Sequence, residues 1–288
     1  MSELPNLLVI GAMKSGTTSL HDYLNMHPDI FMSEIKELDF FLEDRNWNRG
    51  MQWYKDQFPI NSLFRGESSQ NYSKCTQFTG VADRVFQTLK NPKFIYIVRD
   101  PIDRILSHHN ESQSVEQGWS PKDLDKYLLQ NLNNKYINTS KYYMQIQAYL
   151  KYTDLKNIHV LTLERLKESP AEELNRIFSF LGVKNFNVNE TIKKNSSGTK
   201  IQTTFMGKIA RSKILSSLKG IISNDLKNRL KESLLYKKII FKKVKPAKLS
   251  IETKRKIAEY ILDDIKQFEK LFDLDTSQWK NFNKVKID

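Results

Sequence analysis

A lysine and four hydroxyl side chains lie together near the N-terminus, and residues of these types bind anions. The lysine is Lys14, and the hydroxyls belong to Ser15, Thr17, Thr18 and Ser19. An ammonium group adds positive charge, and hydroxyl groups add hydrogen-bond donors. The ligand that this set favours is a phosphate or an anion of similar shape.

The strand, turn and helix predicted around these residues would bring the donors together at the start of the helix. The apolar residues 7–10 predict a buried strand, Gly11 and Gly16 bracket a polar turn, and helical spacing starts at Thr17 with Leu20, Tyr23 and Leu24 inward. Unpaired N–H groups and the positive end of a helix dipole then meet at the turn. The sequence therefore predicts an anion site where the strand leads into the helix.

The order of residues in the turn argues against ordinary ATP or GTP hydrolysis. A nucleotide-triphosphatase loop has its lysine directly after the second glycine. Here Gly11 and Gly16 have the required spacing, but the lysine is Lys14, and Thr17 occupies its usual place. The alternative without chemistry is a helix start that carries a lysine by chance.

A second group of anion-binding side chains follows a second apolar run. Residues 93–98 predict another buried strand, as in a parallel sheet, and Arg99 stands at its carboxyl end, where open α/β sheets bind ligands. Pro101 predicts a helix start, and that helix carries Arg104 and Ser107. Asp100 has an alternative interpretation as a magnesium-binding carboxylate, which Pro101 and the order of the first turn disfavour.

Three motifs resemble the sulfotransferases that use 3′-phosphoadenosine-5′-phosphosulfate (PAPS). These are the turn at 11–19, K-E-x-x-F-F at 36–41, which resembles the heparan-sulfate sulfotransferase-like bacterial branch, and V-R-D-P-x-x-R-x-x-S-H at 98–108. The resemblance implies an α/β, P-loop-like three-layer fold with a mainly parallel central sheet flanked by helices. It also implies PAPS as donor, adenosine 3′,5′-bisphosphate as product, and no metal.

The resemblance assigns residues to both ends of the nucleotide. The 5′-phosphosulfate end would be bound by Lys14, Ser15, Gly16, Thr17, Thr18 and Ser19. Arg99 would hold the 3′-phosphate as a fork, with Ser107 as a second donor. A late glycine-containing loop contributes Ser197, Gly198 and Lys200, although a flexible linker would look the same.

The catalytic base that the resemblance implies is Glu37. A carboxylate within hydrogen-bond reach can remove the proton of an acceptor hydroxyl as its bond to sulfur forms, while Lys14 stabilises the charge on the leaving phosphate. A structural role for Glu37 remains an alternative, as does a base at His108 or His109. Two further candidates, Glu67 and Ser68, lie in a G-E-x-S element that sits near the active site in relatives. Phe40 and Phe41 are expected in the core, and the aromatic residues of 47–58 are expected either to stack on sugars or to pack within the fold.

Charge and composition limit the partners. The net charge is +13, and residues 208–248 hold thirteen Lys/Arg against two acidic residues, a local balance of +11. A solvated basic face, an anionic acceptor and nucleic acid are the alternatives, and nucleic acid is not expected because no recognition motif accompanies the charge. The lone Cys75, the lack of a leader and the lack of a bilayer-length apolar run favour a cytoplasmic protein without a membrane span.

The rest of the chain predicts a single domain over 1–288, with a nucleotide-binding core at 1–204 and a basic helical section at 205–288 packing on it. A third strand is expected at 158–163. Helices are expected at 81–89, 122–132 and 140–152, after Ser169-Pro170, at several short segments of 205–248, and after Ser250. The expected inward stripe of the helix at 140–152 is Tyr143, Ile146 and Leu150, and that of the last helix is Ile257, Ile261, Ile265 and Phe268.

The function expected from these features is transfer of a sulfonyl group from PAPS to an acceptor, either a carbohydrate or a hydroxylated small metabolite. Whether an oxygen or a nitrogen is sulfated stays open, as does the oligomeric state. Two alternatives come from other classes of protein. One is a phosphotransferase of the P-loop kind, and the other is a non-catalytic binder of acidic polysaccharide.

Overall fold

The computed structural model describes residues 4–114, 120–186, 201–203, 241–243 and 247–286. The chain forms two compact units. The first unit consists of Met1–Ile105, Asp125–Lys194 and Leu249–Asp288, and the second of Leu106–Leu124 and Asn195–Lys248. Each unit is described by itself below.

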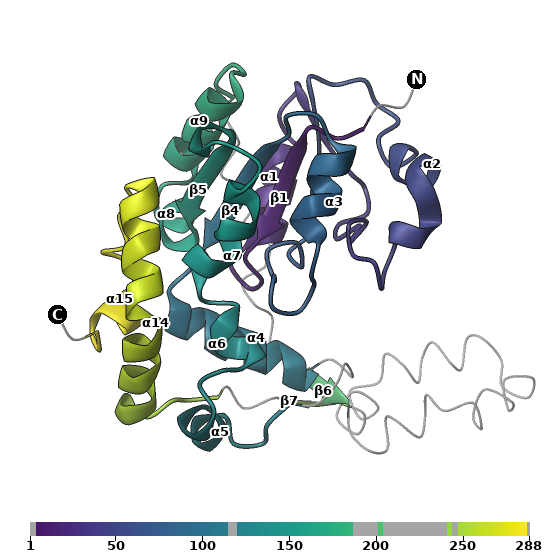
Figure 1. Cartoon of the computed structure of the whole chain (residues 1–288). Helices are drawn as coiled ribbons and strands as arrows, with labels where there is room; N and C mark the ends of the chain where they lie inside the picture. Colours follow the sequence, from purple (N-terminus) through teal and green to yellow (C-terminus); the bar gives the residue numbers. More distant parts are fainter. Residues whose placement is uncertain (1–3, 115–119, 187–200, 204–240, 244–246, 287–288) are drawn as a thin grey trace, which may run out of the picture. The chain divides into compact units, whose positions relative to one another are not determined.

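The centre of the first unit is a five-stranded sheet whose paired strands are all parallel (Figure 1). Its strand order is β2-β3-β1-β4-β5. The strands are β1 (Leu7–Gly11), β2 (Ile30–Met32), β3 (Phe64–Ser68), β4 (Lys93–Val98) and β5 (Ile158–Thr162). The predicted parallel α/β sheet is confirmed, and so are its strands β1, β4 and β5. The sequence analysis did not identify β2 and β3.

Helices lie between and after these strands along the chain. They are α1 (Thr17–Leu24), α2 (Gly50–Lys55), α3 (Val81–Thr88), α4 (Pro101–Ser114), α5 (Leu124–Gln130), α6 (Lys135–Asn138), α7 (Tyr142–Leu150), α8 (Leu163–Glu168) and α9 (Pro170–Leu181). Two 3₁₀ turns, Trp47–Arg49 and Leu155–Asn157, precede α2 and β5. After the second unit the chain adds α14 (Ile251–Phe272) and α15 (Lys280–Asn283).

Helices pack on both faces of the sheet, which makes three layers. On one face, alternate strand residues such as Val9 and Ile97 join a buried cluster with Leu20 of α1 and Ile177 of α9. On the other face, Phe94 meets the ring of Tyr149 from α7, with centroids 5.2 Å apart. Burial on both faces explains why β1 and β4 are continuous apolar runs.

The face that α7 buries differs from the expected one. The expected stripe was Tyr143, Ile146 and Leu150, but the fully buried side chains include Tyr142, Ile146 and Tyr149. The backbone N–H groups of Tyr143 and Met144 donate to the Asp264 carboxylate of α14, at 3.0 and 2.9 Å. These hydrogen bonds attach the first turn of α7 to α14. The helix α5 is also shorter than its expected range of 122–132.

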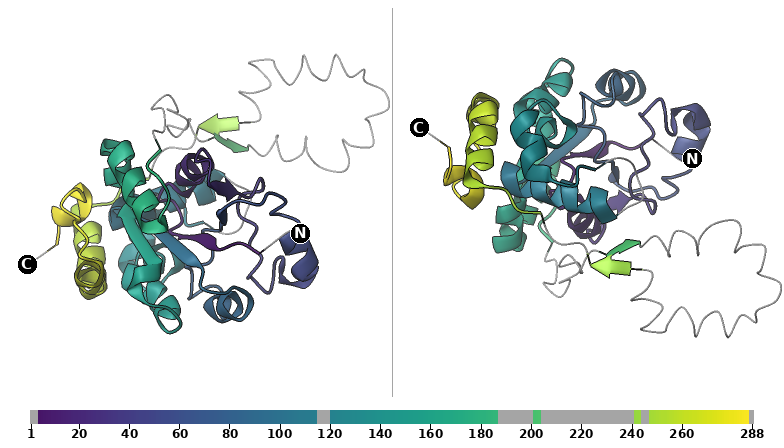
Figure 2. Two further views of the ribbon diagram at one scale, coloured as in Figure 1. Left: turned by 90° about the horizontal axis from the view of Figure 1, so that it is seen from above. Right: turned by 90° about the horizontal axis from the view of Figure 1, so that it is seen from below.

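The last long helix matches its sequence pattern. Ser250 caps α14, because its Oγ accepts from the Thr253 N–H at 3.1 Å. The predicted stripe of Ile257, Ile261, Ile265 and Phe268 is buried. Figure 2 shows α14, in yellow, on the opposite side of the first unit from α2, in blue-violet.

The second unit contains the later part of α4 and a short antiparallel pair, β6 (Ile201–Thr203) with β7 (Phe241–Lys243), in which Ile201 lies opposite Lys243. The short helices expected within 205–248 fall outside the described residues. Among the residues that are described, no helix is both long and apolar enough to cross a membrane.

Candidate active site

The turn after β1 has a backbone that its glycines permit. Gly16 has φ +91°, and a Cβ there would lie 2.5 Å from Leu163 Cδ1. The turn is tied to β4, because Ala12 N–H donates to the Ile97 carbonyl at 2.6 Å, and Ser15 N–H closes it onto the Ala12 carbonyl at 3.1 Å. A glycine is therefore required where the turn enters α1.

Donor groups that have no acceptor among the described residues gather at this turn. Gly16, the N-cap of α1, offers no side-chain cap, and the N–H groups of Gly16, Thr17, Thr18 and Ser19 donate to no described residue. Ser15 is fully buried, and its Oγ has no hydrogen-bond partner in the described part of the chain. Buried donors normally have partners, so the donor set fits an anion with several oxygens.

Two arginines donate to backbone carbonyls of the turn. Arg99, directly after β4, donates from Nη1 to the Lys14 carbonyl at 3.3 Å. The buried Arg104 donates from Nη1 to the Met13 carbonyl at 3.4 Å and from Nε to Ser140 Oγ at 2.6 Å. Burial lowers the pKa of Arg104 to about 10, so it stays charged near neutral pH. The sequence placed Arg104 on its helix but did not indicate its contact with the turn.

Asp100 has a structural role, because its carboxylate accepts hydrogen bonds from backbone N–H groups. Its Oδ1 accepts from the N–H groups of Ile102 and Asp103 in the first turn of α4, at 2.9 and 3.2 Å. Its Oδ2 accepts from Asn281 and Phe282 of α15, at 2.8 and 3.0 Å. Burial raises the pKa of this carboxyl. With both oxygens bound by backbone donors, Asp100 is a poor magnesium ligand.

Glu37 lies beside the end of β3. Its N–H donates to the Ser68 carbonyl at 3.0 Å, and its backbone has φ +64°. Lys36 Nζ pairs with Glu37 Oε1 at 2.7 Å, and the Glu37 side chain is 33% exposed. Its Oε2 accepts from no residue that the structure describes. The carboxylate therefore retains an accessible oxygen that can take a proton.

The strand order brings these groups to one edge of the sheet. Val9 of β1 pairs with Ser68 of β3, and β1 also pairs in parallel with β4. Glu37 is held at the end of β3, the turn carrying Lys14 follows β1, and Arg99 follows β4. Ligands of open parallel sheets bind at this carboxyl edge.

Glu67 is buried in a hydrogen-bonded network under that edge. Its Oε1 accepts from the hydroxyls of Tyr54 and Tyr72 at 2.6 and 2.8 Å, and its Oε2 accepts from Ser69 at 2.7 Å. Burial raises the pKa of Glu67 to about 7. The side chain is fully buried, so it supports the site without reaching a substrate.

Ser68 and Ser69 form hydrogen bonds with the segment that carries Glu37. Ser69 Oγ accepts from the Asp39 N–H at 3.0 Å. Ser68 Oγ is 2.9 Å from His21 Nδ1, and the other ring nitrogen of His21 lies 3.1 Å from the Ser33 carbonyl. Burial, followed by the charge of Lys36, lowers the pKa of His21. The sequence analysis missed His21, which sits at an otherwise apolar helix position.

Phe40 and Phe41 lie in the core, as expected. The ring of Phe40 stacks on Tyr54 with centroids 4.0 Å apart, and Trp47 lies 5.3 Å from Phe40. Arg49 covers Trp53 at 4.1 Å. The aromatic residues of 47–58 therefore pack largely against one another, which matches the alternative to sugar stacking.

The second unit holds further candidates, among them Ser107, His109 and the buried His108. Ser107, a residue of α4, is partly exposed. Both ring nitrogens of His109 are engaged, with Gln113 at 2.9 Å and Ser120 at 3.2 Å, and burial lowers its pKa. This makes His109 a poorer candidate base than Glu37. Ser197, Gly198 and Lys200 lie outside the described residues.

Comparison with known proteins gives one family. The family model described as "Sulfotransferase domain" matches residues 4–261. Human heparan sulfate glucosamine 3-O-sulfotransferase 5 is 29% identical over 196 residues, which are 64% of this chain and 55% of that protein. Mouse bifunctional heparan sulfate N-deacetylase/N-sulfotransferase 4 is 29% identical over 62% of this chain and 22% of its own length.

A solved structure has the same fold. The sulfotransferase from Alicyclobacillus acidocaldarius superposes with a TM-score of 0.64 at 20% identity, covering 96% of this chain and 99% of that one. The chain spans about half the length of the first relative above and about a fifth of the second.

Proposed function

The chain belongs to the sulfotransferase domain family, and we propose that it transfers a sulfonyl group from PAPS to a hydroxyl or amine of an acceptor. The observation that carries this proposal is the set of donors at the turn for which the described ranges provide no acceptor. Ser15 Oγ is buried and unpartnered in the described part of the chain, beside four backbone N–H groups that donate to no described residue. Such a set fits a phosphate or sulfate group.

The nucleotide's other phosphate has a candidate partner next to this turn. Arg99 contacts the Lys14 carbonyl at 3.3 Å, and its fork can also bind a second anion. Two anion sites at one sheet edge suit an adenosine that carries a phosphate at each end. PAPS, when bound, supplies an activated sulfonyl group on a phosphate leaving group.

The chain's own residues then have separate tasks. Lys14, the N–H groups of 16–19 and the dipole of α1 stabilise negative charge on the departing 5′-phosphate oxygen. Glu37 accepts the proton of the acceptor hydroxyl at Oε2, while Lys36 holds Oε1 at 2.7 Å. Arg99 contributes binding and register rather than bond-making.

The reaction is balanced without further reactants. The bond from the acceptor oxygen to sulfur forms as the bond from sulfur to the 5′-phosphate oxygen breaks. The acceptor proton moves to Glu37, and adenosine 3′,5′-bisphosphate leaves with the bonding electrons. The relatives whose names specify heparan sulfate support a carbohydrate acceptor, and a small hydroxylated metabolite is the other class that we consider.

The proposal is tested by incubating the purified chain with radiolabelled PAPS and a panel of glycans and small alcohols, with EDTA present. We expect label transfer to at least one acceptor, and binding of adenosine 3′,5′-bisphosphate by calorimetry. Transfer of phosphate from ATP that stops with EDTA would instead support a phosphotransferase. A chain that binds acidic polysaccharide but not the bisphosphate would support the non-catalytic alternative.

A further inference from the structure

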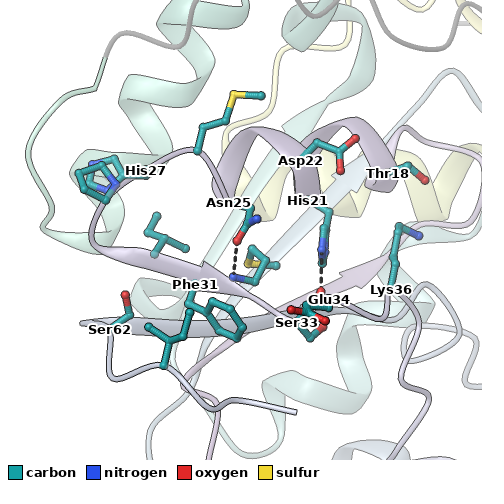
Figure 3. A pocket seen from close by; sticks show the side chains of 15 residues that line it. Thr18, His21, Asp22, Asn25, His27, Phe31, Ser33, Glu34, Lys36 and Ser62 are labelled. Carbon is teal, nitrogen blue, oxygen red and sulfur yellow. Dashed lines mark hydrogen bonds between the residues drawn. The ribbon is translucent and has the colours of Figure 1, made fainter.

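A groove of about 630 Å³ runs between α1 and the edge strand β2 (Figure 3). Three α1 residues at helical spacing form one wall, namely Thr18, Asp22 and Asn25. The strand side contributes Phe31, and Glu34 and Lys36 follow it. Small-molecule sites have volumes of about 300–1,000 Å³, so the groove has room for a short saccharide.

One end of the groove lies at the candidate active site. Thr18 belongs to the first turn of α1, which offers its N–H groups to the anion. Lys36 lines the same groove and holds the Glu37 carboxylate at 2.7 Å. Figure 3 places Thr18, Asp22 and Lys36 at one end and His27 and Ser62 at the other. A molecule in the groove would therefore approach the base.

The groove carries negative charge, in contrast to the chain as a whole. Asp22 and Glu34 are exposed, and neither forms an ion pair with a described residue. Lys36, the single lysine among the lining residues, is already paired with Glu37. Burial lowers the pKa of His21, so its ring adds no compensating charge near neutral pH.

Uncharged groups complete the lining. Asn25 Oδ1 accepts from the Met32 N–H at 2.9 Å, so its amide NH₂ points away from that bond and donates to no described residue. Phe31 is half-buried and Ile60 is 52% exposed, which gives apolar surface for the face of a sugar ring. Donors, acceptors and apolar surface together match a polyhydroxylated ring.

We propose that this groove is the acceptor subsite, and that Asp22 and Glu34 select a hydroxylated acceptor bearing a protonated amine over a sulfated one. This inference rests on the proposed sulfonyl transfer. A protonated amine can pair with a carboxylate of the groove, whereas a sulfate meets like charge. The amine binds while a neighbouring hydroxyl loses its proton to Glu37 and takes the sulfonyl group from PAPS.

The test compares three disaccharides of similar size. Chitobiose carries amines that are partly protonated near neutral pH, N,N′-diacetylchitobiose is neutral, and a heparin-derived disaccharide is sulfated. For each, kcat/KM is measured with PAPS, and the dissociation constant is measured by calorimetry on protein saturated with adenosine 3′,5′-bisphosphate. The variants are Asp22→Asn with Glu34→Gln, and Asp44→Asn is the control because it removes an exposed charge outside the groove.

We expect chitobiose to be preferred, and the Asp22→Asn/Glu34→Gln variant to weaken its binding and kcat/KM by about 10-fold or more, with N,N′-diacetylchitobiose unaffected. The control should behave as the parent does. Preference for the sulfated disaccharide, equal use of all three, or binding of the bisphosphate without use of any amine acceptor would overturn the inference alone. Failure to bind the bisphosphate would overturn the proposed function.

Discussion

Replacing Glu67 with glutamine should remove a pH dependence from the stability of the fold. Glu67 is fully buried, with Tyr54 and Tyr72 donating to one oxygen and Ser69 to the other. Burial raises its pKa from an ordinary 4.5 to about 7. The folded chain therefore keeps the Glu67 proton over a pH range in which the unfolded chain has released it.

The direction of the effect follows from proton binding. Between pH 4.5 and about 7 the folded state binds more protons than the unfolded state, so stability falls as pH rises. At about 1.4 kcal/mol per pH unit, the interval corresponds to a loss of about 3 kcal/mol, complete above the folded pKa. Glu67→Gln resembles the protonated form, so it should match the parent at low pH and exceed its stability at high pH.

Urea unfolding of parent and variant at about pH 5 and pH 8 measures this difference. Subtracting the two proteins removes other groups whose pKa is raised, such as Asp264. If Glu67→Gln does not fold, Tyr54→Phe provides a second measurement, because losing that donor should raise the Glu67 pKa further and move the fall in stability to higher pH. Parallel loss of stability in parent and variant would refute the reasoning.

Four other substitutions separate the tasks assigned to the site. Glu37→Gln should lower turnover on the order of 10²-fold while leaving the calorimetric dissociation constant for adenosine 3′,5′-bisphosphate unchanged, with the exposed Glu43→Gln as control; turnover like that of the control would move the base elsewhere. Arg99→Ala should weaken binding of the same nucleotide by about 10- to 100-fold, and an unchanged constant would contradict the two-anion site. Ser15→Ala should weaken nucleotide binding about 10-fold without lowering the unfolding free energy of the nucleotide-free protein, because its hydroxyl has no described partner there; a fall in that free energy would show that the hydroxyl serves the fold. Asp100→Asn should reduce the urea-measured unfolding free energy by about 2–3 kcal/mol, since its carboxylate accepts from four backbone N–H groups; unchanged stability would contradict that role.

The sequence alone predicted the elements whose signals are local. Residues 7–10 and 94–98 are apolar because both faces of a parallel strand are buried. α9 has its proline at the start and a glycine at its end, and α14 has a capping serine and an apolar stripe. Each of these signals lies within one helix or strand, so no knowledge of distant residues was needed.

Strands β2 and β3 were not predicted because their sequences lack the usual pattern. β2 has three residues, and β3 contains an arginine, a glycine and a glutamate in its five. Glu67 is acceptable in a buried strand only because tyrosines from α2 and from the segment after β3 donate to it. Such partners are contributed by the fold and leave no local pattern.

For the site, the sequence by itself determined the chemical types and the turn that presents them: Lys14, the hydroxyls around it, Arg99 and Glu37. Only the tertiary structure decided their neighbours. In the folded chain Arg99 donates to a carbonyl 85 residues earlier, and Asp100 accepts from the backbone of a helix 181 residues later. A groove also forms between α1 and β2. The reason is physical: strand order and hydrogen bonds between distant residues depend on how the whole core packs, whereas residue type and spacing act within a few residues.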